Sequence, residues 1–438
     1  MKPDFRRSAA PSLHAPFFGP AAVRGAFVMA MLGWGLGVYG LPVYLHAVVE
    51  RTGWPVSLVS SAITVHFLAG ALVIAGLPRL HGRFGLPATT VGGAALASVG
   101  VLGWSLAAEP WQLFAAALAS GGGWVTMGSA AINAVVSPWY SARRPRALST
   151  AYNGATIGGV VFSPLWAMLI ARIGFVAAAA LVGLASVMAI AWLARAVFSR
   201  TPESMGQRAD GLAADAVMRA DAAEPAAPAA PIGALWRDRA FLTLTAGMAM
   251  GLFAQMGLIA HLYSLMVPVL GVRGAGFAMG LATACAVAGR TAVARAMPPH
   301  ADRRRVAAAA YAVQLLGSLA LMAAPADAGW LVLAGVVLFG LGLGNANTLP
   351  PLIAQREFAE ADQPRAVALM IAISQATYAF APAVFGAVIA FAGVAAPAVG
   401  RGAAPLFLAA ALVQAGAIAA LLAGRGARAG DGRPRQAG

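Results

Sequence analysis

The chain has 438 residues, of which 60% are hydrophobic and only 10% are charged, and its mean hydropathy is +0.77. Soluble domains carry about 25% charged residues, so this composition excludes an ordinary soluble protein and indicates a chain that crosses a membrane many times. The net charge of +15 would elsewhere suggest nucleic-acid binding, but the arginines are spread over alternate loops instead of one face, and we expect no nucleic-acid partner.

Twelve apolar runs are long enough to cross a bilayer as helices, since a spanning helix needs about 20 mostly apolar residues. Charged, proline-containing or glycine-containing breaks separate them. The runs lie at residues 21–48, 56–78, 86–107, 111–138, 147–171, 174–198, 238–265, 274–297, 306–325, 329–354, 366–393 and 403–424. We therefore expect an all-α integral membrane protein with twelve transmembrane helices in contact with the lipid bilayer.

The basic residues predict the orientation, because Lys and Arg are held on the cytoplasmic side of a membrane. With the N-terminus inside, the outer loops hold only Arg51, Arg172, Arg273 and Arg401. Residues 1–20 and 425–438 are then cytoplasmic tails. Only Lys2 among the 30 basic residues is a lysine, a bias typical of a high-GC bacterium, so we expect a bacterial inner membrane.

Residues 199–237 break the membrane pattern, because they are charged and then rich in Ala and Pro, and we expect a cytoplasmic linker there. This linker separates two blocks of six runs, at 21–198 and 238–424. The blocks resemble each other: "PRALSTAYNGATIGGVVFSPLWAMLIA" begins at Pro145, and "PRAVALMIAISQATYAFAPAVFGAVIA" begins at Pro364. Two pseudo-symmetric six-helix bundles joined by a linker are typical of transporters that work by alternating access.

The loop between the second and third runs, "PRLHGRFGLP", resembles the G-x-x-x-D-R-x-G-R-R loop of the major facilitator superfamily. Arg83 and Gly85 match that pattern, whereas Gly82 stands where the family has Asp. Together with the twelve runs and the repeat, the chain resembles this superfamily outside its tails and linker. The resemblance implies the superfamily's fold and secondary transport.

Within the superfamily, three stretches resemble monocarboxylate transporters and oxalate and formate antiporters: "GWGLGVYGLPVYL", "RPRALSTAYNGATIGGVVFSPL" and "AGRTAVARAM". In those families an arginine of the eighth span pairs with the substrate carboxylate, and it corresponds to Arg290. Two family partners differ, because Ala286 replaces an Asp and Val43 replaces a Lys. The resemblance implies transport of a small organic anion, a monocarboxylate. The alternative is an exporter of amphipathic drugs or metabolites.

Arg290 also stands out on physical grounds. A charge near the middle of a membrane helix costs roughly 3 kcal/mol on insertion scales, so it normally faces protein or water and marks a pathway. No Asp or Glu lies deep in any apolar run, so an anionic substrate can supply the counter-charge. The alternative is that Arg290, about 10 Å from the inner end of its helix, extends its side chain to the membrane interface.

Seven other polar residues inside the runs are candidates for substrate binding. An unperturbed histidine titrates near neutral pH, so His66 and His261 are each candidates for contact with the substrate or with a coupling proton. Gln375 and Tyr378 share one helical face. For each the alternative is a hydrogen bond between helices. The predicted substrate-binding set is Arg290, His66, His261, Gln375, Tyr378, Asn153, Tyr39 and Asn345.

Signatures of enzymes are missing from the sequence. It has no Walker loop, no Cys and His cluster with metal spacing and no G-x-S-x-G elbow, so we expect neither enzymatic activity nor a cofactor or metal. The single cysteine, Cys285, excludes an internal disulfide. The expected partners are the organic anion and a coupled proton or counter-anion, and we expect a monomer.

Overall fold

The computed structural model describes residues 16–211, 235–298, 300–325, 327–393 and 398–425, and the regular secondary structure of these residues is helical. The first block contains α1 (Gly19–Trp34), a π-helical turn η1 (Gly35–Tyr39), α2 (Leu41–Thr52), α3 (Val56–Leu106), α4 (Pro110–Trp124), α5 (Ser129–Val136) and α6 (Arg144–Leu193). The second contains α9 (Arg239–Ala296), α10 (Arg303–Ala323), α11 (Gly329–Leu343), α12 (Leu349–Glu357), α13 (Gln363–Ala379), α14 (Ala381–Phe391) and α15 (Ala404–Ala423).

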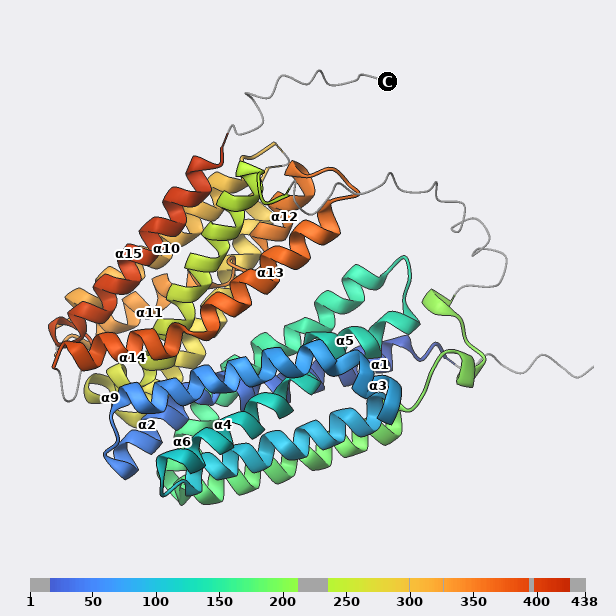
Figure 1. The fold of residues 1–438 in the computed structure, drawn as a ribbon, viewed down its shortest axis with the longest axis horizontal. Helices are drawn as coiled ribbons and strands as arrows, with labels where there is room; N and C mark the ends of the chain where they lie inside the picture. The colour runs from blue at the N-terminus through green and yellow to red at the C-terminus, as the bar shows by residue number, and fades with distance from the viewer. Residues whose placement is uncertain (1–15, 212–234, 299, 326, 394–397, 426–438) are drawn as a thin grey trace, which may run out of the picture.

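Three of these helices are two spans joined by a sharp glycine turn. Gly85 in α3, Gly174 in α6 and Gly271 in α9 have φ values of 79°, 77° and 68°, in the left-handed region that glycine adopts without a steric penalty. The chain reverses direction at these turns (Figure 1). In the part of the chain described, seven helices are long and apolar enough to cross a membrane. With those three divided, and with the interrupted spans 110–139 and 329–357 added, the expected twelve spans are present.

The twelve spans form two bundles that meet at one end and separate at the other (Figure 1). We call residues 16–211 the N-bundle and residues 235–425 the C-bundle. One apolar core is shared by both bundles at the end where they meet, and it includes Leu36, Leu45, Met266 and Phe385. At the other end each bundle has a core of its own. The described ends of the linker and of the chain lie at this second end, which we call the linker end.

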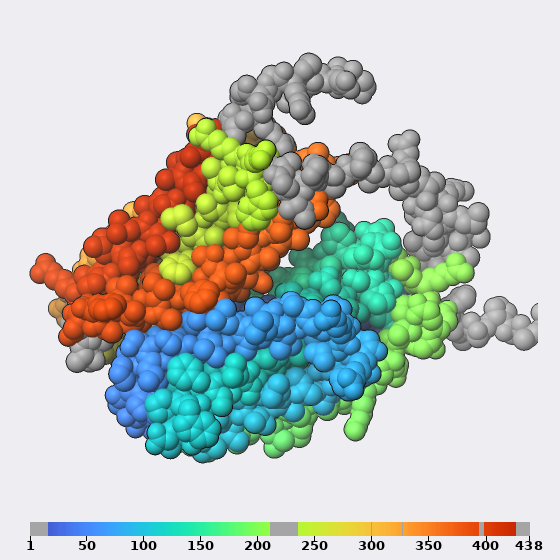
Figure 2. Space-filling model, in the orientation of Figure 1, coloured from blue at the N-terminus to red at the C-terminus, as the bar shows by residue number. Residues whose placement is uncertain are grey.

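Close helix packing joins the bundles at the shared core. The backbone N–H of Ala383 donates a hydrogen bond to Thr64 Oγ1 over 3.2 Å. A Cβ atom on Gly386 would lie 1.9 Å from Ser60 Oγ, and one on Gly276 would lie 2.5 Å from the Ala167 methyl group. Small residues let helix backbones approach closely, so this end is shut. At the linker end a hollow remains between α5 and α13 (Figure 2).

The described beginning of the expected linker folds onto the N-bundle. Asp210, with φ of 59°, accepts hydrogen bonds from the backbone N–H groups of Ser141, Ala142 and Arg143 over 3.0, 2.7 and 3.3 Å. Gln207 Oε1 accepts the backbone N–H of Phe18 over 2.9 Å. Residues 199–211 therefore form a strap across the loop before α6 and the start of α1. Residues 212–234 of the expected linker lie outside the described residues, as do 1–15 and 426–438 of the expected tails.

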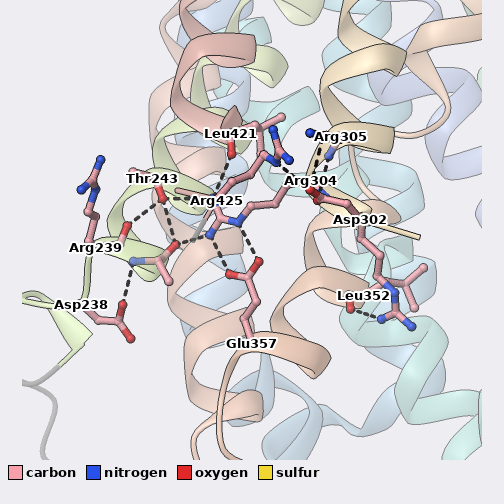
Figure 3. Close-up of polar contacts among 12 residues, drawn as sticks. Asp238, Arg239, Thr243, Asp302, Arg304, Arg305, Leu352, Glu357, Leu421 and Arg425 are labelled. Carbon is pink, nitrogen blue, oxygen red and sulfur yellow. Dashed lines mark hydrogen bonds and ion pairs between the residues drawn. The ribbon is translucent and has the colours of Figure 1, made fainter. Parts of the chain in front are cut away.

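An ion pair fastens the linker end of the C-bundle. The Arg304 side chain, only 2% exposed, donates from Nε and Nη2 to the two carboxylate oxygens of Glu357, both over 2.7 Å. The same guanidinium donates to the carbonyl of Ala240, the hydroxyl of Thr243 and the carbonyl of Leu421. One buried cation thus joins the ends of α9, α10, α12 and α15 (Figure 3).

Candidate functional site

Two adjoining cavities lie where the bundles separate. The first has a volume of about 610 Å³ and the second about 990 Å³. Side chains of both bundles line each cavity, and Ser149, Asn153, Arg290 and Thr348 line both. The rings of Phe67 and Tyr378, 5.8 Å apart, bring α3 and α13 together beside the first cavity. This position, between pseudo-symmetric bundles, is where substrates of such folds bind.

Both interrupted spans are broken at the cavities. The N-bundle span stops being helical at Gly128, between the 3₁₀ turn η2 (Val125–Met127) and α5, and the C-bundle span does so between α11 and α12. Gly128 and Ser129 line the first cavity, and Thr348 and Leu349 line the second. Irregular backbone at membrane depth is tolerated where it lines a cavity. The first turns of α5 and α12 thus begin at the cavities, and a helix N-terminus favours an anion.

Arg290 lies in the second arm of α9 and lines both cavities. It is half-buried. Across the described residues its guanidinium has no hydrogen bond or ion pair, and no Asp or Glu lines either cavity. Next to it, Gly289 lets α9 approach α11, because a Cβ atom there would lie 2.0 Å from the Leu341 carbonyl oxygen. Arg290 is therefore a cation without a protein counter-ion, on a closely packed helix. Arg295 adds a second positive charge to the wider cavity.

Four other residues of the predicted set also reach the cavities. Gln375 and Tyr378 line the first cavity, Asn345 lines the second, and Asn153 lines both. Tyr39 does not line either cavity. Its ring lies against Gly159, and it interacts electrostatically with Arg290. The amide and hydroxyl groups of these residues give the cavities both hydrogen-bond donors and acceptors.

The two predicted histidines lie outside both cavities. His66 is fully buried and its Nε2 is 2.9 Å from the Gly37 carbonyl oxygen, which can only accept. Its Nδ1 therefore accepts from Ser120 Oγ over 2.8 Å. His261, 1% exposed, lies 3.1 Å from the Pro382 carbonyl through Nε2. The geometry favours the interhelical alternative over substrate contact for both, because each ring is held between helices and away from the cavities.

The aromatic wall of the first cavity was missed by sequence reasoning. Trp34 and Trp124 both line the cavity, in a T-shaped pair with centroids 5.6 Å apart. Trp124 also stacks on the His66 ring at 6.0 Å, so the buried histidine supports the wall from behind. Tyr152, Asn347 and Met248 also line the first cavity and lie outside the predicted substrate-binding set. A signal was present, since Trp34 and Trp124 each follow glycine in the middle of an apolar run.

The π-helical turn η1 holds Trp34 in place. Its carbonyl groups at Gly35 and Gly37 accept side-chain hydrogen bonds, from the Trp166 indole over 3.1 Å and from His66. Pro42, which has no backbone N–H, follows directly in α2, and a π-helical turn of this kind is frequent at functional sites. The "GWGLGVYGLP" stretch thus forms a local deformation that other helices of the N-bundle stabilise.

The described residues include no group of three or more His, Cys, Asp or Glu side chains that would hold a metal ion. The cavities instead combine the guanidinium groups of Arg290 and Arg295, several neutral polar groups and an apolar, partly aromatic wall. Small-molecule sites are typically lined in this way, by apolar surface with a few polar groups.

The chain is similar to solved structures of membrane transporters, at low sequence identity. The nucleoside transporter NupG has a TM-score of 0.71, with 10% identity over 92% of this chain and 98% of NupG, and its D323A mutant gives 0.71 with 11% identity over 92% and 100%. A bacterial homologue of the human lysosomal transporter Spinster, in an inward-facing and occupied conformation, gives 0.61 with 15% identity over 95% of this chain and 96% of that one. At these identities the likeness shows the fold.

A search of curated protein sequences finds no match. The sequence profile of the Major Facilitator Superfamily matches residues 25–382, which is most of the chain and includes both halves of the site. With twelve spans in two bundles around central cavities, the chain belongs to the major facilitator superfamily and is a membrane transporter, not an enzyme.

Proposed function

We propose that the chain moves a small organic anion, a monocarboxylate with an apolar body, across the bacterial inner membrane by alternating access. The observation that carries this proposal is Arg290, which lines both cavities without an acidic partner among the described residues. Arg binds a carboxylate through two parallel hydrogen bonds, and a hydrogen bond to a charged group contributes about 1.5–3 kcal/mol.

The shape and lining of the first cavity support an apolar substrate body. Its volume of about 610 Å³ lies within the roughly 300–1,000 Å³ typical of small-molecule sites. Trp34, Trp124 and Tyr378 offer flat apolar surfaces, and Gln375 and Asn153 offer neutral hydrogen-bonding groups. A carboxylate at Arg290 with its hydrocarbon body against the tryptophans uses both features.

The direction of opening follows from the orientation rule. The cavities lie toward the linker end, and if basic loops mark the cytoplasm, this end and both termini are cytoplasmic. The structure then corresponds to the state that exchanges substrate with the cytoplasm. The outward-open state requires the shared core around Thr64 and Ala383 to part while the linker ends of the bundles approach each other.

The second candidate is an exporter of amphipathic compounds. It is favoured by Val38, Met248, Leu252 and Met256, an apolar side of the first cavity that includes flexible methionines suited to varied ligands. NupG is a nucleoside transporter by name, so a nucleoside belongs among the competitors in the test.

Transport by purified protein in vesicles separates these candidates. Labelled monocarboxylates with short and aromatic bodies should accumulate, and Arg290→Gln should abolish accumulation. Arg79→Gln, at an exposed arginine of α3 near the Gly85 turn, should not. Uptake of a hydrophobic cation or of a nucleoside that exceeds uptake of every acid, and that survives Arg290→Gln, would reject the anion proposal.

A further inference from the structure

A third pocket lies apart from the two central cavities, between the first turn of α1 and the beginning of α6. It has a volume of about 420 Å³, and its lining includes Arg24, Arg143 and Arg146 together with Tyr140 and Thr150. The three arginines are exposed. Within the described ranges none of the three guanidinium groups has a hydrogen bond or an ion pair. Three unpaired cations converge on one pocket.

Asp210 is the acidic group that the structure places next to this pocket. Its carboxylate accepts the backbone N–H groups of Ser141, Ala142 and Arg143, so its oxygens are already hydrogen-bonded. Burial raises the pKa of the Tyr140 phenol, and the nearby Asp210 carboxylate adds to this while Arg143 opposes it. With three arginines and one acid, the pocket keeps a net positive charge.

The pocket continues into a strip of exposed apolar side chains. Arg146, Thr150, Ile157 and Val161 are spaced by 4, 7 and 4 residues, which places them on one face of α6 at 3.6 residues per turn. Ile157 and Val161 are 40% and 43% exposed. Ile157 also lines the second cavity together with Phe27 of α1. The basic pocket at the ends of two membrane helices suits the charged headgroup of a phospholipid, and the apolar side chains deeper in the span suit its acyl chain.

We propose that this pocket binds a phosphate group, specifically the headgroup of an anionic phospholipid whose acyl chain lies along Ile157 and Val161. Basic pockets between membrane helices on the cytoplasmic side bind anionic headgroups, and basic residues near such a surface each add to the affinity. The bound lipid would hold α1 and α6 together at the edge of the second cavity. This inference depends only on the pocket and the spans, and not on the nature of the transported substrate.

Photo-crosslinking of the full-length wild-type chain in lipid nanodiscs tests the site without requiring a variant. The probe is a phosphatidylglycerol with a photoreactive headgroup, in a phosphatidylcholine bilayer. We expect crosslinks to concentrate within residues 16–27 and 140–157, and excess phosphatidylglycerol to suppress them. Crosslinks spread evenly over all basic loops would overturn the proposal, and suppression by inorganic phosphate at equal concentration would show a site for free anions instead of lipid.

A charge-matched pair of triple variants measures the contribution of the arginines. Arg24→Gln, Arg143→Gln and Arg146→Gln together should weaken phosphatidylglycerol binding by roughly 100-fold. Arg79→Gln, Arg83→Gln and Arg208→Gln together remove the same charge from exposed positions and should leave the affinity within about threefold of wild type. Equal losses in the two variants would mean that only overall charge attracts the lipid, and the pocket would then be rejected.

Discussion

The two bundles repeat each other in sequence and topology, yet their linker ends are fastened differently. In the C-bundle, Arg304 and Glu357 form a buried ion pair among helices of the same bundle. In the N-bundle the corresponding loop has Gly82 at the family's acidic position, and Arg83 stacks on Phe84 at 5.2 Å. A segment from beyond the sixth span fastens this end instead, through Asp210. Duplicated halves therefore keep the same helix arrangement while using different contacts.

This difference has a mechanical consequence. The C-bundle end is fixed by side chains inside the bundle, whereas the N-bundle end depends on a strap that leads into the linker. Both ends must approach each other when the cavities close. We therefore expect loss of the ion pair to destabilise the C-bundle itself, and loss of the strap to act mainly on the loop before α6.

The largest effect is expected from Glu357→Ala. It leaves the Arg304 cation, 2% exposed, without its carboxylate, and removal of one partner of a buried ion pair costs about 3–5 kcal/mol. The unfolding midpoint of the purified protein should fall strongly. Arg305→Met is the matched control, because its guanidinium is 66% exposed and 3.7 Å from Asp302, and such pairs contribute about 1 kcal/mol or less. Equal shifts for both variants would contradict the comparison.

A smaller effect is expected from Asp210→Gly. Glycine keeps the left-handed backbone at this position but loses hydrogen bonds to three N–H groups, at a cost of about 1.5–3 kcal/mol. Protease cleavage within residues 199–211 should accelerate, while the unfolding midpoint should fall less than for Glu357→Ala. Asp210→Asn, which keeps an acceptor oxygen and tolerates this backbone, should lie between wild type and glycine. A strap that stays protected in Asp210→Gly would show that Asp210 does not hold it.

The shut end of the molecule provides a third test, because there the bundles share a core. A leucine at Gly386 would meet Ser60, and overpacking of this kind costs about 1–3 kcal/mol. We expect Gly386→Leu to separate the bundles at this end, measured as a longer distance between spin labels at Thr52→Cys and Arg273→Cys in a Cys285→Ser background. Gly402→Leu is the control, since a Cβ atom there has no neighbour within 4 Å. An unchanged label distance in Gly386→Leu would contradict a tightly shut end.

The smallest effect is expected from Asp302, at the start of α10. Burial alone would raise its pKa, but hydrogen bonds from Arg305, Arg425 and Arg304 outweigh burial and hold the pKa below the usual 3.8. A carboxyl group with a lowered pKa in the folded protein adds stability above its unfolded pKa and loses it as pH falls through the folded pKa. Asp302→Asn should therefore unfold slightly earlier than wild type at pH 7, and the difference should vanish well below pH 3.8. A difference independent of pH would contradict this.

Much of the fold was predictable from local patterns. The twelve spans were identified from the length of apolar helix that crosses a bilayer. The repeat of "PRA" at Pro145 and Pro364 indicated two bundles. The glycine turns at Gly85 and Gly271 fall between predicted runs, and the turn at Gly174 lies at the first residue of the run 174–198. The strap was not predictable, because an isolated polar segment carries no periodic pattern, and Asp210 shows its role only through backbone groups some 70 residues earlier.

The candidate site was predictable where a residue was chemically out of place. Arg290 stood out as a charge in an apolar run, and the structure places it beside both cavities. Trp34 and Trp124 escaped notice because an apolar ring in a membrane helix looks like ordinary packing. His66 and His261 stood out in the sequence because a histidine in an apolar run is unusual. In the structure each ring instead forms a hydrogen bond with a backbone carbonyl group of another span.

The most direct test is whether the central cavities distinguish a carboxylate ligand from the uncharged amide of the same shape. Purified wild-type protein should be stabilised against heat by a monocarboxylate and not by the corresponding amide, because a ligand that binds the folded protein raises its stability by mass action. Arg290→Gln should abolish this difference, and Arg290→Lys should keep part of it. Equal stabilisation by acid and amide in the wild type, or an undiminished response to the acid in Arg290→Gln, would contradict an anion site built on Arg290.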